Sequence, residues 1–433
     1  MRPPHPTQPR SLTLLKKRIN VRLAIVCVAA ASVGLSMALI SIAKLLLILC
    51  GLATLLFTRR APGTTSPLAN TFTPIAVLIA LSALALSLLW SVAPPAEALD
   101  SVVKYGKLLV ILVMVLLIRD KREAVYALGA FALAQVFLLT SSWMLAAHLP
   151  VPWATSRMAL TEYSVFSSYL DQGIIGAVFA AVCWHLRFLA PGRWGPRLAV
   201  AVAALALGNV FFILQGRSGH AVAIALISIA VMWELPKRYR AAAVLLPFAL
   251  ALGLFASSAK VRDRLSLVGT EVQAYSSHQA TETSSGIRLN FWHRAAQIIA
   301  QHPLAGSGVG SWSTEYNRLQ STQNPTHQPI AASGNPHQEY LLWGVQLGIP
   351  GILIFLGLLL CVLRDTLTMD APYARAAQST VLAMAVACLF NASLYDAQIG
   401  DFFCVLIGLL LALGLTHNTG TASPATSQHK PTA

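Results

Sequence analysis

The sequence predicts an all-α polytopic membrane protein with about twelve transmembrane helices and one large external loop. Its 433 residues are 56% hydrophobic and only 11% charged, whereas soluble domains carry roughly 25% charged residues. The apolar residues gather in long runs, and the basic residues gather in short segments between those runs. The net charge of +15 therefore indicates orientation in a membrane and gives no support for nucleic-acid binding.

Twelve apolar runs account for the predicted helices, since a membrane-spanning helix needs roughly 20 apolar residues. The runs cover residues 23–40, 41–58, 73–93, 106–118, 124–147, 167–190, 198–214, 221–234, 241–257, 339–363, 374–393 and 402–416. A tight break before Lys44 is expected to separate the first two runs. Segment 96–107 mixes charged and apolar residues, so we expect it to lie along the membrane interface.

The positions of lysine and arginine predict the orientation of these helices. The N-terminal tail is basic and should remain cytoplasmic. Counting spans alternately from that tail places every dense basic edge on the cytoplasmic side; these edges are 59–60, 119–122, 187–197, 237–240 and Arg364 with Arg375. The predicted organisation is a cytoplasmic tail (1–22), transmembrane helices one to nine (23–257), a large external loop with helices (258–337), transmembrane helices ten to twelve (338–416) and a cytoplasmic tail (417–433).

The stretch 333–351, SGNPHQEYLLWGVQLGIPG, joins the long polar loop to an apolar helix. Pro336 disfavours a helical conformation at Asn335, so the turn is expected to end close to His337. An ionisable side chain where the chain enters the membrane is a candidate for function. The structural alternative is that His337 only caps the helix or bonds to backbone.

Two arginines are predicted to lie on the same external face as His337. Arg217 occurs in LQGRSGH, where glycines expose backbone N–H groups beside a guanidinium, a combination that suits a phosphate-like anion. Arg288 occurs on a predicted helix of the loop, and a helix in so long a loop can form a lid over a membrane-embedded site. The alternatives are snorkelling to lipid phosphate for Arg217 and a plain interfacial position for Arg288.

Four further residues are candidates for supporting roles. Arg157 is a third cation on the external face, Asp171 and Asp396 are carboxylates that could orient His337 or bind sugar, and Tyr340 could stack on a sugar. Each also has a structural interpretation, as a partner of a basic neighbour or as an interfacial aromatic residue. The chain has no HExxH motif, no P-loop and no GxGxxG followed by a strand and a helix, so we predict no metal and no cofactor.

Three features together resemble the O-antigen ligase family, within the wider O-antigen ligase and polymerase superfamily. They are Arg217 after GNVFFILQG, SGIRLNFWHRA followed by HPLAGSGVGSW, and NPHQEYLLWGVQLGIPG. The last is similar to the family pattern H-[NSQ]-x-Y/F-L followed by two glycines, in which the histidine closes the large periplasmic loop. With the twelve-run layout, the resemblance extends over nearly the whole chain.

The resemblance implies a GT-C-like glycosyltransferase of lipopolysaccharide biosynthesis in the bacterial inner membrane, with its active site on the periplasmic face. Its partners would be an undecaprenyl-pyrophosphate-linked glycan as donor, a hydroxyl of the lipid A–core oligosaccharide as acceptor, and membrane lipids. The transfer would be inverting and independent of metal and cofactor. The resemblance also implies that His337 is the catalytic base and that Arg217 and Arg288 bind the pyrophosphate.

Three alternatives remain open from the sequence. An O-antigen polymerase would use the same donor with another lipid-linked glycan as acceptor, although a single long loop favours a ligase. Another undecaprenyl-pyrophosphate-dependent O-glycosyltransferase is the second alternative. The third, from a different class, is a transporter of the lipid-linked glycan. Transporters usually place charges in mid-span, whereas most spans here are free of charge and the ionisable residues cluster on one face.

Overall fold

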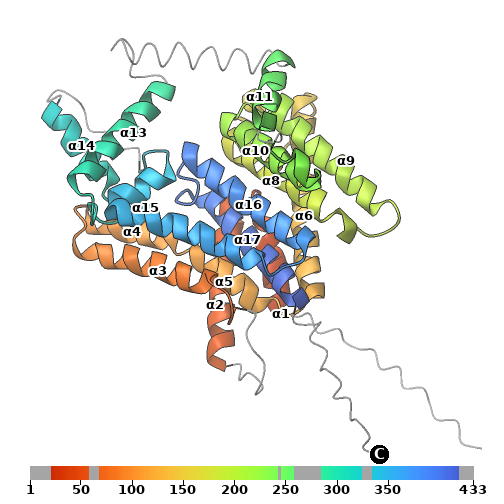
Figure 1. Ribbon diagram of the computed structural model, residues 1–433, viewed down its shortest axis with the longest axis horizontal. Coiled ribbons are helices and arrows are strands. Elements are labelled where there is room, and N and C mark those ends of the chain that lie inside the picture. The colour runs from red at the N-terminus through yellow and green to blue at the C-terminus, as the bar shows by residue number, and fades with distance from the viewer. Residues whose placement is uncertain (1–20, 58–67, 242–244, 258–283, 324–333, 419–433) are drawn as a thin grey trace, which may run out of the picture.

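The computed structural model describes residues 21–57, 68–241, 245–257, 284–323 and 334–418, and within these ranges the regular structure is helical, with no strand. Most of both predicted tails, and segments 258–283 and 324–333 of the predicted loop, lie outside the described residues. Figure 1 shows the arrangement of the helices. They are α1 (Val21–Ser32), α2 (Met37–Phe57), α3 (Thr73–Leu86), α4 (Pro95–Tyr105), α5 (Leu108–Leu117), α6 (Lys121–Ala146), α7 (Ala159–Glu162), α8 (Tyr169–His185), α9 (Gly195–Gly208), α10 (Arg217–Glu234), α11 (Leu246–Ser257), α13 (Ser284–Gln301), α14 (Trp312–Gln323), α15 (Glu339–Thr366), α16 (Ala371–Phe390) and α17 (Ala397–Asn418).

Six helical stretches of the described chain are long and apolar enough to cross a membrane: Met37–Phe57, Lys121–Ala146, Gly195–Ile213, Glu339–Thr366, Ala371–Phe390 and Ala397–Leu415. Every predicted apolar run contains a helix, although several of these helices are shorter than a bilayer requires. The protein is therefore a helical polytopic membrane protein. The count of twelve spans and the single large loop stay predictions.

One predicted helix boundary is wrong. The sequence places the break between the first two helices just before Lys44, but α1 ends at Ser32 and α2 begins at Met37. Lys44 lies inside α2, where its ammonium pairs with Asp401 of α17 at 2.8 Å. In the sequence, a lysine inside an apolar run suggests the end of a membrane helix. Here the lysine lies within the helix, because a buried carboxylate from a distant helix pairs with it.

The last helix, α17, lies at the centre of the bundle (Figure 1). It packs against α5, α6 and α16, and its most apolar stretch of 18 residues is completely buried inside the protein. By contrast, α2 exposes many large apolar side chains, as expected of a helix that faces lipid. Apart from Gln398 and Asp401, nearly every side of α17 is apolar, as expected of a helix that protein surrounds.

Helices α8 and α10 approach each other through two glycines. A Cβ atom on Gly219 of α10 would lie 2.9 Å from backbone atoms of Gly173 on α8, which is too close for a side chain. This contact fixes the start of α10, where Arg217 is located, against the start of α8. Small residues at such a crossing allow membrane helices to pack closely.

We expect Gly219→Ala to destabilise the protein by about 1–3 kcal/mol, because the added methyl group forces α8 and α10 apart. Thermal unfolding in detergent measures the effect. Gly173→Ala is the matched control, since its Cβ would lie 3.4 Å from Gly219, an ordinary contact. Alanine is also favoured over glycine in a helix by about 1 kcal/mol, so this variant should be at least as stable as the wild type. Equal losses from both variants would contradict the close-contact explanation.

Helix α15 is kinked. Gly348 has a φ of +70°, which is not helical, and Pro350 follows inside the same helix. Proline has no N–H group, so the Gln346 carbonyl, four residues earlier, lacks its usual helical partner. Unpaired backbone groups are costly in an apolar environment, and the kink therefore requires partners from elsewhere in the protein.

Segment 303–308, which follows α13, crosses the kink and supplies those partners; we call it the crossing segment. The Ser307 N–H donates to the Val345 carbonyl (2.8 Å), the Gly308 N–H to the Gln346 carbonyl (2.9 Å), and the Ile349 N–H to the Pro303 carbonyl (2.8 Å). The approach to α15 is so close that a Cβ on Gly306 would meet the Gln346 backbone at 2.4 Å. The crossing segment thus fastens α13 and α14 to α15.

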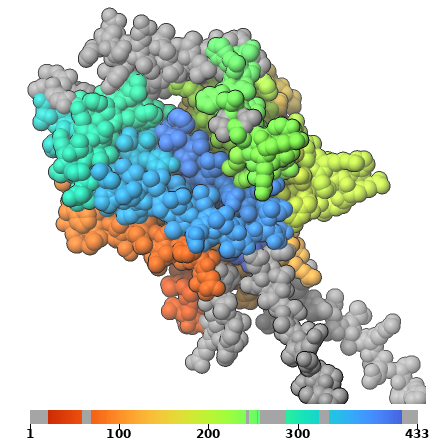
Figure 2. Space-filling model, viewed as in Figure 1, coloured from red at the N-terminus to blue at the C-terminus, as the bar shows by residue number. Residues whose placement is uncertain are grey.

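Because of these hydrogen bonds, α13 and α14 pack against α15. Figure 2 shows α13 and α14 in teal and cyan lying over α15, with α9 and α11 in the greens on the other side of the same face. The sequence predicts helices within segment 258–337, and α13 and α14 are helices of that segment. Together they form a cap over the start of α15, where His337 is located.

Candidate functional site

His337 lies directly before α15, but it does not cap that helix. The cap is the side chain of Gln338, which accepts the Leu341 N–H at 2.6 Å. His337 itself has a φ of +52°, in the left-handed region that residues other than glycine rarely adopt. Its backbone N–H donates to the side-chain oxygen of Asn335 at 2.9 Å. The capping alternative for His337 is therefore wrong.

The imidazole of His337 packs under α13. It stacks on Phe291, with ring centroids 6.0 Å apart and an angle of 20° between the ring planes. In the part of the chain that the structure describes, neither ring nitrogen of His337 has a hydrogen-bond partner. The ring is thus held in place by stacking and by its turn, and among the described residues its nitrogens carry no hydrogen bond.

The charges of the two predicted arginines are coupled to this histidine, one directly and the other through the first. Arg288 is one turn before Phe291 on α13, and its charge acts on His337. Arg217 is in the first turn of α10, and its charge acts in turn on Arg288. All three side chains are half-buried. Like charges are costly to bring together, so this arrangement favours an anion between or beside the arginines.

Burial and the neighbouring charges shift the pKa values of these groups. Burial, and secondly the positive charge of Arg288, lower the pKa of His337 below its ordinary value. Burial and the charge of Arg217 lower the pKa of Arg288, and Tyr169 opposes this shift. A lowered pKa keeps the imidazole neutral at neutral pH, and only a neutral imidazole accepts a proton.

The same shift predicts the pH dependence of the reaction. If His337 acts as a base, kcat/KM should fall as the pH falls through its pKa, because protonation removes the base. The acid limb should lie below pH 6.5 in the wild type, since the pKa of His337 is lowered. Arg288→Gln removes one cause of the lowering, so its acid limb should move to higher pH. Acid limbs at the same pH in the two proteins would contradict the coupling.

Asp396, in segment 391–396 between α16 and α17, is joined to the histidine turn through Asn335. The Asn335 side-chain nitrogen donates to Asp396 at 3.3 Å, while its oxygen accepts from His337. Burial raises the pKa of Asp396 to about 6, and the Lys107 charge and the Asn335 hydrogen bond oppose that shift. The charge of Asp171, in the first turn of α8, also interacts with Asp396. Both predicted carboxylates thus lie near the turn, with Asn335 between Asp396 and the histidine.

Glu339 anchors the turn from the other side. Its side chain is completely buried, and it accepts hydrogen bonds from Tyr105 (2.9 Å), Trp343 (3.1 Å) and the backbone N–H groups of Leu394 and Tyr395 (both 3.0 Å). Each carboxylate oxygen therefore has two donors. Glu339 connects the start of α15 to segment 391–396, and its position is structural.

We expect Glu339→Ala to destabilise the protein by at least about 3 kcal/mol, because it leaves buried donors without acceptors, each costing about 1–3 kcal/mol. Glu339→Gln should cost less, since its one carbonyl oxygen still serves two of the donors. Thermal unfolding in detergent ranks the stabilities of the two variants and the wild type. A Glu339→Ala protein as stable as Glu339→Gln would show that the anchor contributes little.

The other two supporting candidates are an exposed arginine and a packed tyrosine. Arg157 is exposed in the segment before α7. Tyr340 points toward α16, where its hydroxyl donates to the Ala385 carbonyl at 3.0 Å and its ring packs against Phe355. These contacts account for Tyr340 as a packing residue.

Sequence reasoning missed three residues that shape the cluster. Asn335 holds the His337 turn, Tyr169 lies near the arginines, and Tyr395 lies on the far side of the Glu339 anchor. A signal existed for Asn335, because asparagine side chains commonly bond to backbone two residues further on. No comparable local signal marks the two tyrosines.

Among the described residues, no group of three or more His, Cys, Asp or Glu side chains is arranged to hold a metal ion. The positive charge of the cluster comes from arginine side chains.

The fold and the cluster define a polytopic helical membrane protein with a histidine and two arginines near the start of a membrane helix. Residues 201–356 match a family model described as O-antigen ligase. The matched residues include Arg217, Arg288 and His337. This part of the chain is therefore similar to the O-antigen ligase family, whose members are glycosyltransferase-like enzymes of O-antigen processing. A comparison with curated proteins finds no match.

Proposed function

We propose that this protein is an O-antigen ligase. It transfers a polysaccharide from undecaprenyl pyrophosphate to a hydroxyl of the lipid A–core oligosaccharide, on the periplasmic face of the bacterial inner membrane. The observation that carries the proposal is the grouping of two arginines with mutually interacting charges and a half-buried histidine, whose ring has no hydrogen bond to the described residues. The similarity of residues 201–356 to the O-antigen ligase family supports the same class of donor.

His337 is the proposed general base. A neutral imidazole takes the proton of the acceptor hydroxyl, and the oxygen attacks the anomeric carbon of the donor glycan while the bond to pyrophosphate breaks. The lowered pKa of His337 supports this role, because the ring is neutral before the reaction. Asn335 and Asp396 act as positioning residues that hold the turn.

Arg217 and Arg288 are the proposed pyrophosphate-binding residues. Negative charge builds up on the leaving pyrophosphate, and preorganised guanidinium groups stabilise such charge in the transition state. The proximity of the two like charges supports this role, since a bound dianion would relieve their repulsion. The displacement occurs in one step and inverts the anomeric configuration.

Transfer in vitro tests the proposal. Purified protein is incubated with undecaprenyl-pyrophosphate-linked glycan and lipid A–core in the presence of EDTA, and the products are separated by gel electrophoresis. We expect a glycan–lipid A–core conjugate. Growth of chains on the undecaprenyl carrier would instead identify a polymerase. Movement of the lipid-linked glycan across a vesicle membrane, with no conjugate formed, would identify a transporter.

A further inference from the structure

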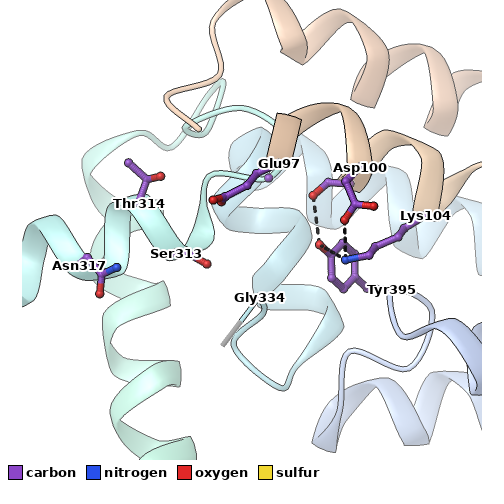
Figure 3. A pocket seen from close by; sticks show the side chains of 10 residues that line it. Glu97, Asp100, Lys104, Ser313, Thr314, Asn317, Gly334 and Tyr395 are labelled. Atoms are coloured by element: carbon purple, nitrogen blue, oxygen red, sulfur yellow. Dashed lines mark hydrogen bonds and ion pairs between the residues drawn. The ribbon is translucent and has the colours of Figure 1, made fainter. Parts of the chain in front are cut away.

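A polar pocket lies beside the His337 turn, between α4, α14 and segment 391–396 (Figure 3). Its volume is about 350 Å³, enough for a few sugar rings or a comparable polar ligand. The arginines belong to other elements, α10 and α13. The pocket is therefore a second polar feature of the same region.

One wall of the pocket is a single face of α4. Glu97, Asp100 and Lys104 recur at a helical spacing of three and four residues, and all three line the cavity. Asp100 and Lys104 form an ion pair at 2.8 Å but remain 60% and 38% exposed. The sequence predicts that this amphipathic segment lies along the interface. Its charged face lines the cavity, and the position of the segment along the membrane interface stays a prediction.

The opposite wall comes from α14. Ser313, Thr314 and Asn317 line the pocket from one face of that helix, across from α4 (Figure 3). Their hydroxyl and amide groups both donate and accept hydrogen bonds. Together with the carboxylates of α4, they match the dense and mixed hydrogen-bonding groups of a sugar.

Tyr395 completes the pocket with a fixed aromatic ring. Its hydroxyl bonds with Ser101 (3.1 Å) and with the Lys104 ammonium (3.2 Å), and the ammonium lies 4.6 Å from the ring centroid. The Tyr395 N–H is held by Glu339. The ring is thus immobilised from both ends.

The pocket adjoins the proposed base. Gly334 lines it and lies three residues before His337. Tyr395 also lines it and is followed by Asp396, which bonds to Asn335. A ligand in the pocket would therefore lie next to the turn that carries His337, on the side formed by α4, α14 and segment 391–396.

We propose that this pocket binds the sugars of the acceptor next to the hydroxyl that is glycosylated; the inference rests on the proposed ligase function. The two carboxylates and one ammonium of the pocket carry a net negative charge, which disfavours a pyrophosphate and suits sugar hydroxyls. In an inverting displacement the nucleophile approaches the face of the anomeric carbon opposite the leaving group. The leaving group lies at Arg217 and Arg288, so the acceptor lies beyond His337.

Steady-state kinetics with both substrates tests the pocket. Glu97→Ala and Asn317→Ala should each raise the KM for lipid A–core about tenfold, the loss expected for one or two hydrogen bonds to the ligand. The KM for the undecaprenyl-linked donor should change less than about twofold. Ser321→Ala, on α14 one turn beyond the pocket, is the control and should leave both KM values unchanged. A rise in the donor KM instead of the acceptor KM would overturn the inference.

Direct binding separates this inference from the proposed function. Lipid-free core oligosaccharide is titrated into wild type and Thr314→Trp in detergent by isothermal calorimetry. Because the tryptophan fills the pocket, we expect at least a tenfold loss of affinity. Equal affinities would overturn the inference even if the wild type is an active ligase. Binding that depends on Thr314, in a protein that forms no conjugate, would retain the pocket and reject the ligase.

Discussion

Replacement of His337 by alanine is expected to reduce kcat/KM for glycan transfer about a thousandfold, within the range of about 10²–10⁴ that general bases contribute. The acceptor hydroxyl is a weak nucleophile and needs a base. Residues 334–338 contain no histidine besides His337, so no second imidazole of this turn can replace it. The KM values should change little, because the ring acts mainly in the transition state. Transfer to lipid A–core, followed by gel electrophoresis, measures the rate.

A matched control separates loss of the base from damage to the fold. His293 lies on α13 and is exposed, and it contacts Gln297 at 3.0 Å in the same helix. His293→Ala should retain transfer within about twofold, since surface substitutions away from a site usually have small effects. A His337→Ala protein that unfolds at the wild-type temperature and transfers glycan at the wild-type rate would remove His337 from the mechanism.

Removal of either arginine charge is the second large expected effect. Arg217→Ala and Arg288→Ala should each lower kcat by about 100- to 1,000-fold, the loss seen when one preorganised electrostatic contact to a transition state is removed. Lysine at either position should restore only part of the rate, because an ammonium lacks the fork geometry of a guanidinium. Single-turnover transfer with saturating donor measures the chemical step.

The two arginines should also prove coupled. Their charges interact across α10 and α13, so the double variant should lose less than the product of the single losses. Arg122→Ala, at an exposed arginine in the first turn of α6, is the control and should transfer normally. Independent, multiplicative losses would show that Arg217 and Arg288 act on different groups.

The helices could be predicted from the sequence because their signal is local. An apolar run of sufficient length forms a helix wherever it is shielded from water, and every predicted run contains one. The candidate residues could be named for the same reason, since His337 and Arg217 each stand beside an apolar run. The break near Lys44 was wrong because the partner of that lysine, Asp401, is 357 residues away.

The contacts that organise the site could not be predicted, because they join distant parts of the chain. Glu339 bonds to Tyr105 and to Tyr395, at separations of 234 and 56 residues. The pocket needs α4 and α14, which the sequence separates by the whole of α5 to α13. A local pattern predicts that α4 has a polar face, but only tertiary packing decides what that face meets.

The crossing segment has a consequence for the order of assembly. Its bonds to Val345 and Gln346, and the bond from Ile349 to Pro303, require residues that leave the ribosome after α13 and α14. Arg288 and Phe291 therefore cannot be docked onto His337 until α15 has entered the bilayer and bent at Gly348. A nascent chain truncated before residue 345 should expose α13 to protease, and extension past residue 350 should protect it. The cluster of His337, Arg217 and Arg288 would thus be completed late in biogenesis, after most of the helical bundle has been synthesised.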